Sequence, residues 1–337
     1  MRVAGLLVGG ALAVALVRRV GLDSLRSVLS RVGPEFLWMV AAYAAGTAVT
    51  ALPWGMLIPR AVRPSWKAVV ASRFAASGLN ALLPFFAIGE AGRLLWMPRP
   101  SWPQGTAAIV GDRLLFLASG ALMLLATAGV ALLLSDLPPM LDLIGAIIAL
   151  AIIAGIVALG ALAARGHLAR RGGLLLRRLG LRRTPPAGAD GAGSDAAVLP
   201  IWDTALRDLL AGPRRRLLAG LAVHLAGRLL FALEIYAALR VLELPAGWRE
   251  TMIMAAVPIA LSVVGTFIPS QLGIQEACQA LVAGALGIGP AGGLALVLLQ
   301  RARQLLFIAL SGLLMALAPL RRSVPAQAAG QEATGEG

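Results

Sequence analysis

The chain has 337 residues, of which 59% are hydrophobic and only 14% are charged, and its formal net charge is +14. Soluble globular domains carry roughly a quarter charged residues, so this composition excludes an ordinary soluble domain and predicts an integral membrane protein. The arginines gather in loops and in the tail beside apolar runs, a pattern typical of cytoplasmic loops of membrane proteins and not of nucleic-acid binding.

Apolar segments and one interruption organise the first transmembrane half, residues 1–164. Spans are predicted over residues 3–17, 36–58, 105–134 and 140–164. Leu22 to Phe36 carries apolar residues at helical spacing, which predicts a short helix along the membrane surface. Residues 66–97 contain Pro84 and several polar side chains, so we expect a broken or re-entrant hairpin there.

The segment 165–216 separates the two halves and has a different composition. It holds eleven arginines and four aspartates, which places it in the cytoplasm by the excess of positive charge. Residues 184–200 are of low complexity and are predicted to be disordered. A short amphipathic helix is predicted from Trp202 to Leu210, and partner proteins could dock on this loop.

The second transmembrane half, residues 217–320, repeats the pattern of the first. Full spans are predicted over residues 217–241 and 291–319, and a second broken hairpin over 250–288. The tail, residues 321–337, is predicted to be disordered and cytoplasmic. The fold class is therefore an all-α membrane protein with about six full spans and two broken hairpins.

The two hairpins have matching parts. The first runs A-L-L-P, then G-E, then D-R-L-L-F at 112–116, and the second runs T-F-I-P, then G-I-Q-E, then R-Q-L-L-F at 303–307. The predicted helix breaks are Pro84, Gly89, Pro269 and Gly273. Paired interruptions at corresponding places of two halves point to an internal repeat and to a transporter's substrate site.

Two topologies fit this pattern. If both hairpins return to the side from which they enter, the first opens to the cytoplasm, the second opens outside, and the repeat is inverted. That version puts four arginines, Arg18, Arg19, Arg26 and Arg31, outside. If both segments cross fully, Arg60, Arg63 and Lys67 go outside instead, so charge counting leaves both open. We favour the inverted version because it explains the repeat.

At these residues the sequence resembles a known family. The patterns N-A-L-L-P…G-E-x-x-R (Asn80 to Arg93) and P-S-x-L-G-I-Q-E (Pro269 to Glu276), followed by R-A-R-Q-L-L-F, are similar to the lysylphosphatidylglycerol synthase transmembrane, or flippase-like, family. The form of the second pattern is most similar to the hopanoid-biosynthesis-associated subgroup. Members often have Gly-Gly before the acid, where this chain has Ile88-Gly89.

The resemblance implies a membrane protein that moves, or helps to move, lipids between leaflets. Bifunctional members carry a soluble aminoacyl-transferase domain after the membrane region, and this chain ends about seventeen residues after its last span, so we expect no synthetase activity.

Ionisable side chains at membrane depth are candidate functional residues because they cost several kcal/mol unless they are paired or hydrated. The candidates for contact with a substrate are Asn80, Glu90, Arg93, Asp112, Arg113, Glu276, Arg301 and Arg303. For Glu90 and Glu276 the alternative is a structural role, in which each carboxylate caps the N-terminus of the short helix that follows the break. A buried arginine would suit a phosphate headgroup.

Two further expectations concern pairing. Asp112 and Arg113 are interpreted as an interfacial anchor or a local ion pair, and aligning the repeats on L-L-F places Asp112 opposite Arg303, which predicts a contact between them. His224 and Arg228, four residues apart, are interpreted as polar packing residues.

The leading hypothesis is a multi-pass inner-membrane lipid transporter whose partner is a phospholipid or a hopanoid-like lipid. One cysteine and two histidines predict no metal site, no cofactor is expected, and no phosphate-binding G-x-x-x-x-G-K-[ST] motif is present. Alternatives are a non-transporting scaffold for lipid-synthesis proteins or an intramembrane lipid-modifying enzyme. No Ser-His-acid set supports the enzyme, so the chain is expected not to be one.

Overall fold

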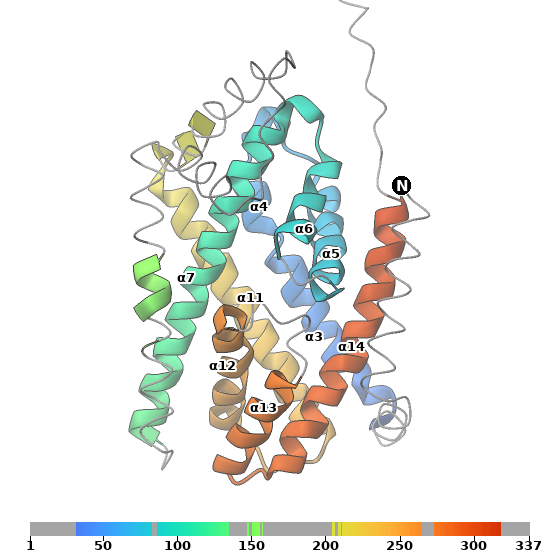
Figure 1. The fold of residues 1–337 in the computed structure, drawn as a ribbon, viewed down its shortest axis with the longest axis vertical. Coiled ribbons are helices and arrows are strands. Elements are labelled where there is room, and N and C mark those ends of the chain that lie inside the picture. The colour runs from blue at the N-terminus through green and yellow to red at the C-terminus, as the bar shows by residue number, and fades with distance from the viewer. Residues whose placement is uncertain are drawn as a thin grey trace, which may run out of the picture.

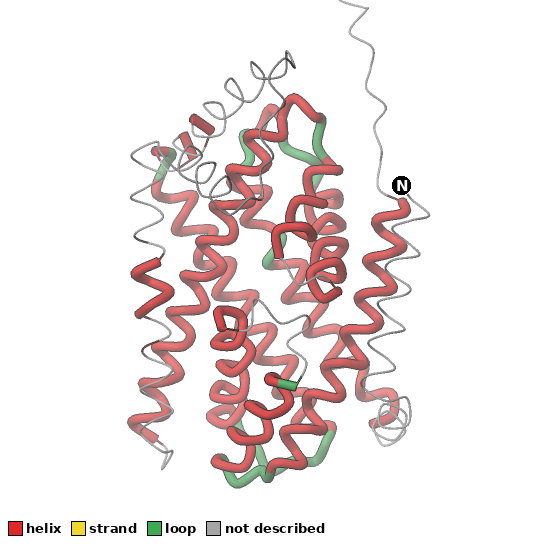
Figure 2. Tube along the Cα trace, viewed as in Figure 1, coloured by secondary structure: helices red, strands yellow, loops and turns green. Residues whose placement is uncertain are grey.

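The computed structural model describes most of the predicted membrane region. The described residues are 32–82, 86–134, 147, 150–155, 157, 204–205, 208–209, 211–264 and 273–317. Every regular element within these ranges is a helix, as the predicted all-α class requires (Figure 2). The predicted span 3–17, the low-complexity segment 184–200 and the tail 321–337 lie outside the described residues.

The helices keep the order expected from the sequence. The α-helices are α3 (Phe36–Val49), α4 (Leu52–Leu57), α5 (Trp66–Leu82), α6 (Phe86–Gly92), α7 (Trp102–Leu134), α11 (Arg214–Val241), α12 (Trp248–Val264), α13 (Ile274–Ala285) and α14 (Pro290–Leu317). Short 3₁₀ helices join them at η1 (Gly33–Glu35), η2 (Arg60–Val62), η3 (Arg93–Trp96) and η4 (Arg99–Ser101). Pro53 lies in the first turn of α4, just after the break from α3, where a proline without an N–H is tolerated but cannot continue the preceding helical ladder.

Among the described residues, four helical segments are long and apolar enough to cross a membrane. They are Gly33–Leu57, Arg99–Val130, Arg214–Val241 and Pro290–Ala316. These segments correspond to four of the six predicted spans. The predicted span at 140–164 is described only at a few helical positions, and the short amphipathic helix at 202–210 is helical at 204–205 and 208–209.

The two hairpins enter the bundle from opposite ends, and their tips approach each other at mid-height (Figure 1). Helix α5 runs inward from the end where α4 finishes, and α6 returns toward that end. Helix α12 runs inward from the opposite end, and α13 returns there. Both segments therefore turn back instead of crossing, which is the arrangement predicted for an inverted repeat.

The break positions agree only partly with the prediction. Gly273 has φ +85° and directly precedes α13, so it ends the interruption as expected. Gly89 is not a break, because α6 already begins at Phe86 and continues through it. A Cβ on Gly89 would collide with the Asn80 side chain, so this glycine lets α6 lie close to α5. Pro84 and Pro269 lie outside the described residues.

The helices of the two halves pack in matching ways, as an approximate two-fold relation between the halves would require. Helices α3 and α11, which precede the two hairpins, pack along each other at the centre. The first hairpin helix α5 packs on α14, and the second hairpin helix α12 packs on α7. Each hairpin is therefore held by the long helix that follows the other hairpin, and this exchange brings both tips to the middle of the bundle.

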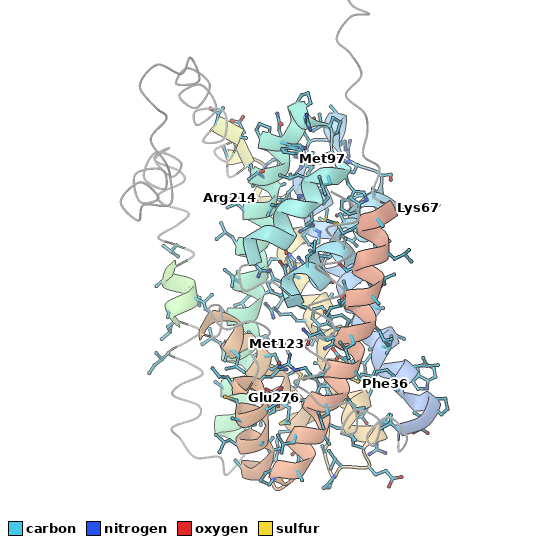
Figure 3. All side chains as sticks on the ribbon, turned by 45° about the vertical axis from the view of Figure 1, so that its right-hand side comes forward. Phe36, Lys67, Met97, Met123, Arg214 and Glu276 are labelled. Carbon is cyan, nitrogen blue, oxygen red and sulfur yellow. The ribbon has the colours of Figure 1, made fainter. Side chains whose placement is uncertain are left out.

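The two ends of the bundle differ in charge. The described cations at the end where α5 begins are Arg60, Arg63, Lys67, Arg99, Arg214, Arg215 and Arg216. The opposite end has the described acids Glu35, Glu243 and Glu250 beside Arg240 and Arg249. In Figure 3, Lys67, Met97 and Arg214 lie toward the first end and Phe36 toward the other. The cations at 60–67 thus share one end with Arg214–Arg216, as the inverted topology predicts.

Candidate functional site

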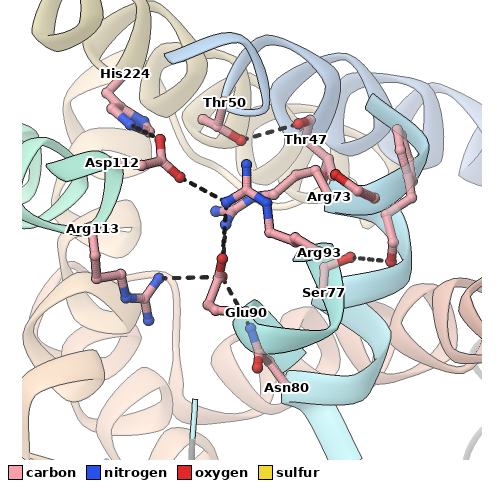
Figure 4. A network of polar contacts seen from close by, with 12 residues as sticks. Thr47, Thr50, Arg73, Ser77, Asn80, Glu90, Arg93, Asp112, Arg113 and His224 are labelled. Atoms are coloured by element: carbon pink, nitrogen blue, oxygen red, sulfur yellow. Dashed lines mark hydrogen bonds and ion pairs between the residues drawn. The ribbon is translucent and has the colours of Figure 1, made fainter. Parts of the chain in front are cut away.

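The tip of the first hairpin holds a connected cluster of charged side chains around Glu90 (Figure 4). Arg73 Nη1 of α5 donates to Glu90 Oε1 at 2.8 Å, and Asn80 Nδ2 donates to the same oxygen at 3.2 Å. Arg113 Nη1 of α7 lies 4.0 Å from that oxygen. Glu90 is the fifth residue of α6 and is buried, so its carboxylate binds side chains and does not cap the helix.

Arg93 joins the hairpin to α7. Its Nη1 donates to Glu90 Oε2 at 2.9 Å and to Asp112 Oδ2 at 2.8 Å. The side chain has no exposed surface, and its guanidinium lies over the Trp54 ring, 4.4 Å from the ring centroid. An arginine clamped between two carboxylates and an indole is held in one position. Arg93 is therefore a structural clamp more than a contact for a mobile ligand.

Asp112 completes this cluster from α7, where it is buried and not interfacial. Besides Arg93 it contacts His224 of α11, whose Nε2 lies 3.0 Å from Asp112 Oδ1. The contact predicted between Asp112 and Arg303 is wrong. Asp112 faces the first hairpin and α11, and both of its oxygens already have partners there.

The tip of the second hairpin holds a smaller cluster. Glu276 Oε2 accepts the backbone N–H of Gly273 at 2.7 Å, so Glu276 does cap α13 as the structural alternative predicted. Its Oε1 also accepts from Arg301 Nε and Nη2 of α14, at 3.1 and 3.0 Å. Arg301 Nη1 in turn donates to Gln304 Oε1 at 2.9 Å. Capping and ion pairing thus coexist in one side chain.

A third ion pair joins α14, the helix that also carries Arg301, to α11. Arg303 Nε of α14 is 2.9 Å from Glu234 Oε1 of α11, and both side chains are almost completely buried. The Arg303 guanidinium also lies 3.6 Å from the centroid of the Tyr43 ring on α3. This contact links the central helices α3 and α11 to the last span.

The structure brings together five of the eight predicted site residues. Asn80, Glu90, Arg93, Asp112 and Arg113 meet at the first hairpin, Glu276 and Arg301 pair at the second, and Arg303 pairs elsewhere. Sequence reasoning left Arg73, His224 and Glu234 out of the candidate set. Arg73 shares a helical face with Asn80, and Glu234 is the sole acid within its span, so both signals were present in the sequence.

The chemistry available at these clusters is electrostatic. Carboxylates and guanidinium groups at membrane depth can bind charged headgroup atoms or exchange partners as a ligand enters. Among the described residues, no group of three or more His, Cys, Asp and Glu side chains could hold a metal ion.

Comparison with known proteins identifies a family that the chain matches. The model of the lysylphosphatidylglycerol synthase TM region matches residues 2–312 of the chain. Neither the curated proteins nor the solved structures give a match.

Proposed function

This chain belongs to the lysylphosphatidylglycerol synthase TM region family, and on that basis we propose that it moves an amphiphilic lipid between the leaflets of a membrane. One observation carries the proposal. Two broken hairpins enter from opposite ends and bring an acid paired with arginine, Glu90 or Glu276, to each tip. Such half-helices meeting at the midplane are the arrangement by which transporters expose one site alternately to two sides.

In this proposal the headgroup passes between the hairpin tips while the acyl or polycyclic tail stays in the bilayer. The carboxylate–guanidinium contacts of both tips keep charged groups at membrane depth without leaving any of these carboxylates unpaired. A headgroup that approaches the first cluster meets Arg73 and Arg113, whose side chains keep 11% and 28% of their surface exposed, whereas Arg93 stays buried. The protein would act on lipids without making or breaking covalent bonds.

The orientation follows from charge. We place the end that carries Arg60, Lys67 and Arg214–Arg216 in the cytoplasm, because positively charged loops are retained there. The C-terminal end of α14 lies at the same end, so the tail would also be cytoplasmic. The residues 165–216 would then be available to cytoplasmic partner proteins, and the membrane would be the inner membrane of a bacterium.

A reconstituted system tests the proposal. Vesicles that contain the purified protein would carry a fluorescent lipid in both leaflets. A membrane-impermeant quencher added outside would report, over time, the fraction of the fluorescent lipid that moves from the inner to the outer leaflet. We expect the rate to exceed that of protein-free vesicles and to fall in a double variant, Glu90→Gln with Glu276→Gln. A double variant that retains the wild-type rate would remove both acids from the mechanism, and a wild-type rate equal to that of empty vesicles would refute transport.

A further inference from the structure

A cavity of about 500 Å³ lies at the basic end of the bundle, apart from the hairpin tips. Its wall combines the end of α4, the first turns of α7, the start of α11 and the helical positions 204–205 and 208–209. Ligand pockets usually enclose roughly 300–1,000 Å³, so this volume suits a small ligand or a headgroup. Its lining residues Gln104 and Ala107 precede Asp112 on α7, which separates the cavity from the Glu90 cluster by about 8–12 Å along the helix.

The cavity lies at the depth of lipid headgroups. Leu57, in its wall, is the last residue of the first described span, and Leu217 lies in the first turn of the span that begins at Arg214. Gln104 lies in the first turns of the span that begins at Arg99. Since span ends mark the boundary between the hydrocarbon core and water, a ligand here can keep an apolar part in the bilayer.

The helical positions at 204–209 close one side of the cavity. Ala205 and Leu209 share a helical face and pack beside Ala107 of α7. A Cβ on Gly111 would come within 2.6 Å of the Leu209 side chain, so Gly111 provides room for this contact. Asp208, next to Leu209 in the chain, lines the cavity and is exposed. The segment therefore contributes apolar contacts to the bundle and a carboxylate to the cavity.

Three polar groups of the lining have no described partner. Gln104 Oε1 is buried and accepts no hydrogen bond. Asp208 and Arg216 line the same cavity, and neither side chain forms an ion pair with the other or with another described residue. A buried acceptor without a donor costs about 1–3 kcal/mol, so a ligand that donates to Gln104 removes a penalty. The lining thus offers two acceptors, one of them charged, and one guanidinium.

Arg60 and Arg63 strengthen the positive side of this site. The pKa of Arg63 is lowered by burial and, to a smaller extent, by repulsion from Arg60 and Arg216, so the three guanidinium groups lie close together. None of the three pairs with a carboxylate in the described part of the chain. An anionic group bound at Arg216 would therefore lie in a positive field.

We propose that this cavity binds a headgroup that combines a phosphate with a primary ammonium, as phosphatidylethanolamine does. Arg216 binds the phosphate oxygens through its planar fork, and the ammonium donates to Asp208 and to Gln104 Oε1. A choline headgroup has the same phosphate and the same net charge, but its quaternary ammonium has no N–H and leaves both acceptors unpaired. The site is independent of the proposed transport function.

Binding measurements on the purified full-length protein test the headgroup chemistry. Native mass spectrometry would compare phosphatidylethanolamine with phosphatidylcholine of identical acyl chains, and free phosphoethanolamine with free phosphocholine. We expect the ethanolamine lipid to bind about three- to tenfold more tightly than the choline lipid, because its N–H groups satisfy the acceptors. Equal affinity within both pairs would overturn the proposal. A preference shown by the lipids and absent from weakly bound free headgroups identifies the membrane as the source, whereas equally tight binding of free phosphoethanolamine identifies a soluble ligand of the same chemistry.

Two substitutions separate the acceptor from the guanidinium. Asp208→Asn should lower the affinity for the ethanolamine lipid and leave that for the choline lipid unchanged, so the preference falls. Arg216→Gln should weaken both lipids and keep the preference. Both side chains are exposed, so neither change should lower the unfolding temperature. The matched controls are Glu35→Gln and Arg240→Gln, which remove one charge of each sign at the opposite end and should bind as the wild type does. A folded Asp208→Asn variant with the wild-type preference contradicts the assignment.

The outcome for this site and the outcome for transport can be told apart. An ethanolamine preference that depends on Asp208, without leaflet exchange in the vesicle assay, would leave the site standing and refute the proposed function. Leaflet exchange without any such preference would leave transport standing and refute the site.

Discussion

Gly46 of α3 and Gly227 of α11 lie against each other at the centre of the bundle, and a side chain on either would press on the backbone carbonyl of the other. A Cβ on Gly46 would come within 3.2 Å of Gly227 O, and a Cβ on Gly227 within 3.4 Å of Gly46 O. The two helices, which hold equivalent places in the two halves, therefore approach each other closely at this crossing. Small residues at such a crossing let membrane helices approach closely.

This contact predicts that Gly227→Ala destabilises the protein. The new methyl group would collide with the Thr50 side chain, and overpacking of this kind typically costs about 1–3 kcal/mol. Thermal unfolding in detergent measures the effect. Gly129→Ala in α7 is the matched control, because a Cβ there meets nothing within 4 Å and helix propensity favours alanine by about 1 kcal/mol. Equal losses in the two variants would show that the crossing is not tight.

Because Arg93 is clamped between two carboxylates, we predict that its replacement destabilises the protein more than replacement of the neighbouring Arg73. Arg93→Gln leaves Asp112 with His224 as its sole hydrogen-bonded side chain among the described residues. It also removes the partner of a buried charge, a loss of roughly 3–5 kcal/mol. Arg73→Gln should cost less, since Glu90 keeps Arg93 and Arg113 nearby. Chemical denaturation of both variants tests the order. A smaller loss for Arg93→Gln than for Arg73→Gln would contradict the assigned role of the clamp.

The Glu234–Arg303 pair predicts non-additive mutations. Either single variant, Glu234→Leu or Arg303→Leu, leaves one buried charge without its partner and should cost about 3–5 kcal/mol. The double variant should lie close to the wild type, because an apolar pair replaces an ion pair in an apolar environment. A double-mutant cycle on unfolding free energies gives the coupling. Arg249→Gln at the exposed pair with Glu250 is the control and should change stability by less than about 1 kcal/mol. Additive losses at Glu234 and Arg303 would mean that the two side chains act independently.

The proposed orientation predicts opposite labelling of two positions. In a Cys278→Ser background, Lys67→Cys and Glu35→Cys place single thiols at the two ends of the bundle. A membrane-impermeant maleimide added to intact cells should label Glu35→Cys at once and Lys67→Cys only after the cells are permeabilised. The reverse pattern would place the basic end outside and refute the cytoplasmic assignment.

The sequence by itself determined the class of protein, the helical elements and the two interrupted hairpins. Composition requires a membrane, and the matched order of proline, glycine and glutamate in the two halves favours hairpins that enter from opposite ends, although charge counting left a full crossing open. It also identified Glu90 and Glu276 as the acids of the hairpins, because ionisable groups within apolar runs stand out.

Only the tertiary structure decided which charges meet. Apolar residues surround the long spans on nearly all sides, so the sequence does not indicate which face of each helix turns toward which neighbour. The repeat alignment therefore predicts a contact between Asp112 and Arg303. In the structure Asp112 contacts Arg93 and His224, which are 19 and 112 residues away from it in the sequence. The sequence also predicts a helix break at Gly89. In the structure this glycine allows α6 to pack closely on α5, and nothing in the neighbouring residues distinguishes a packing glycine from a helix break. Ion pairs in a bundle depend on helix rotation, and helix rotation is fixed by packing between segments far apart in the chain.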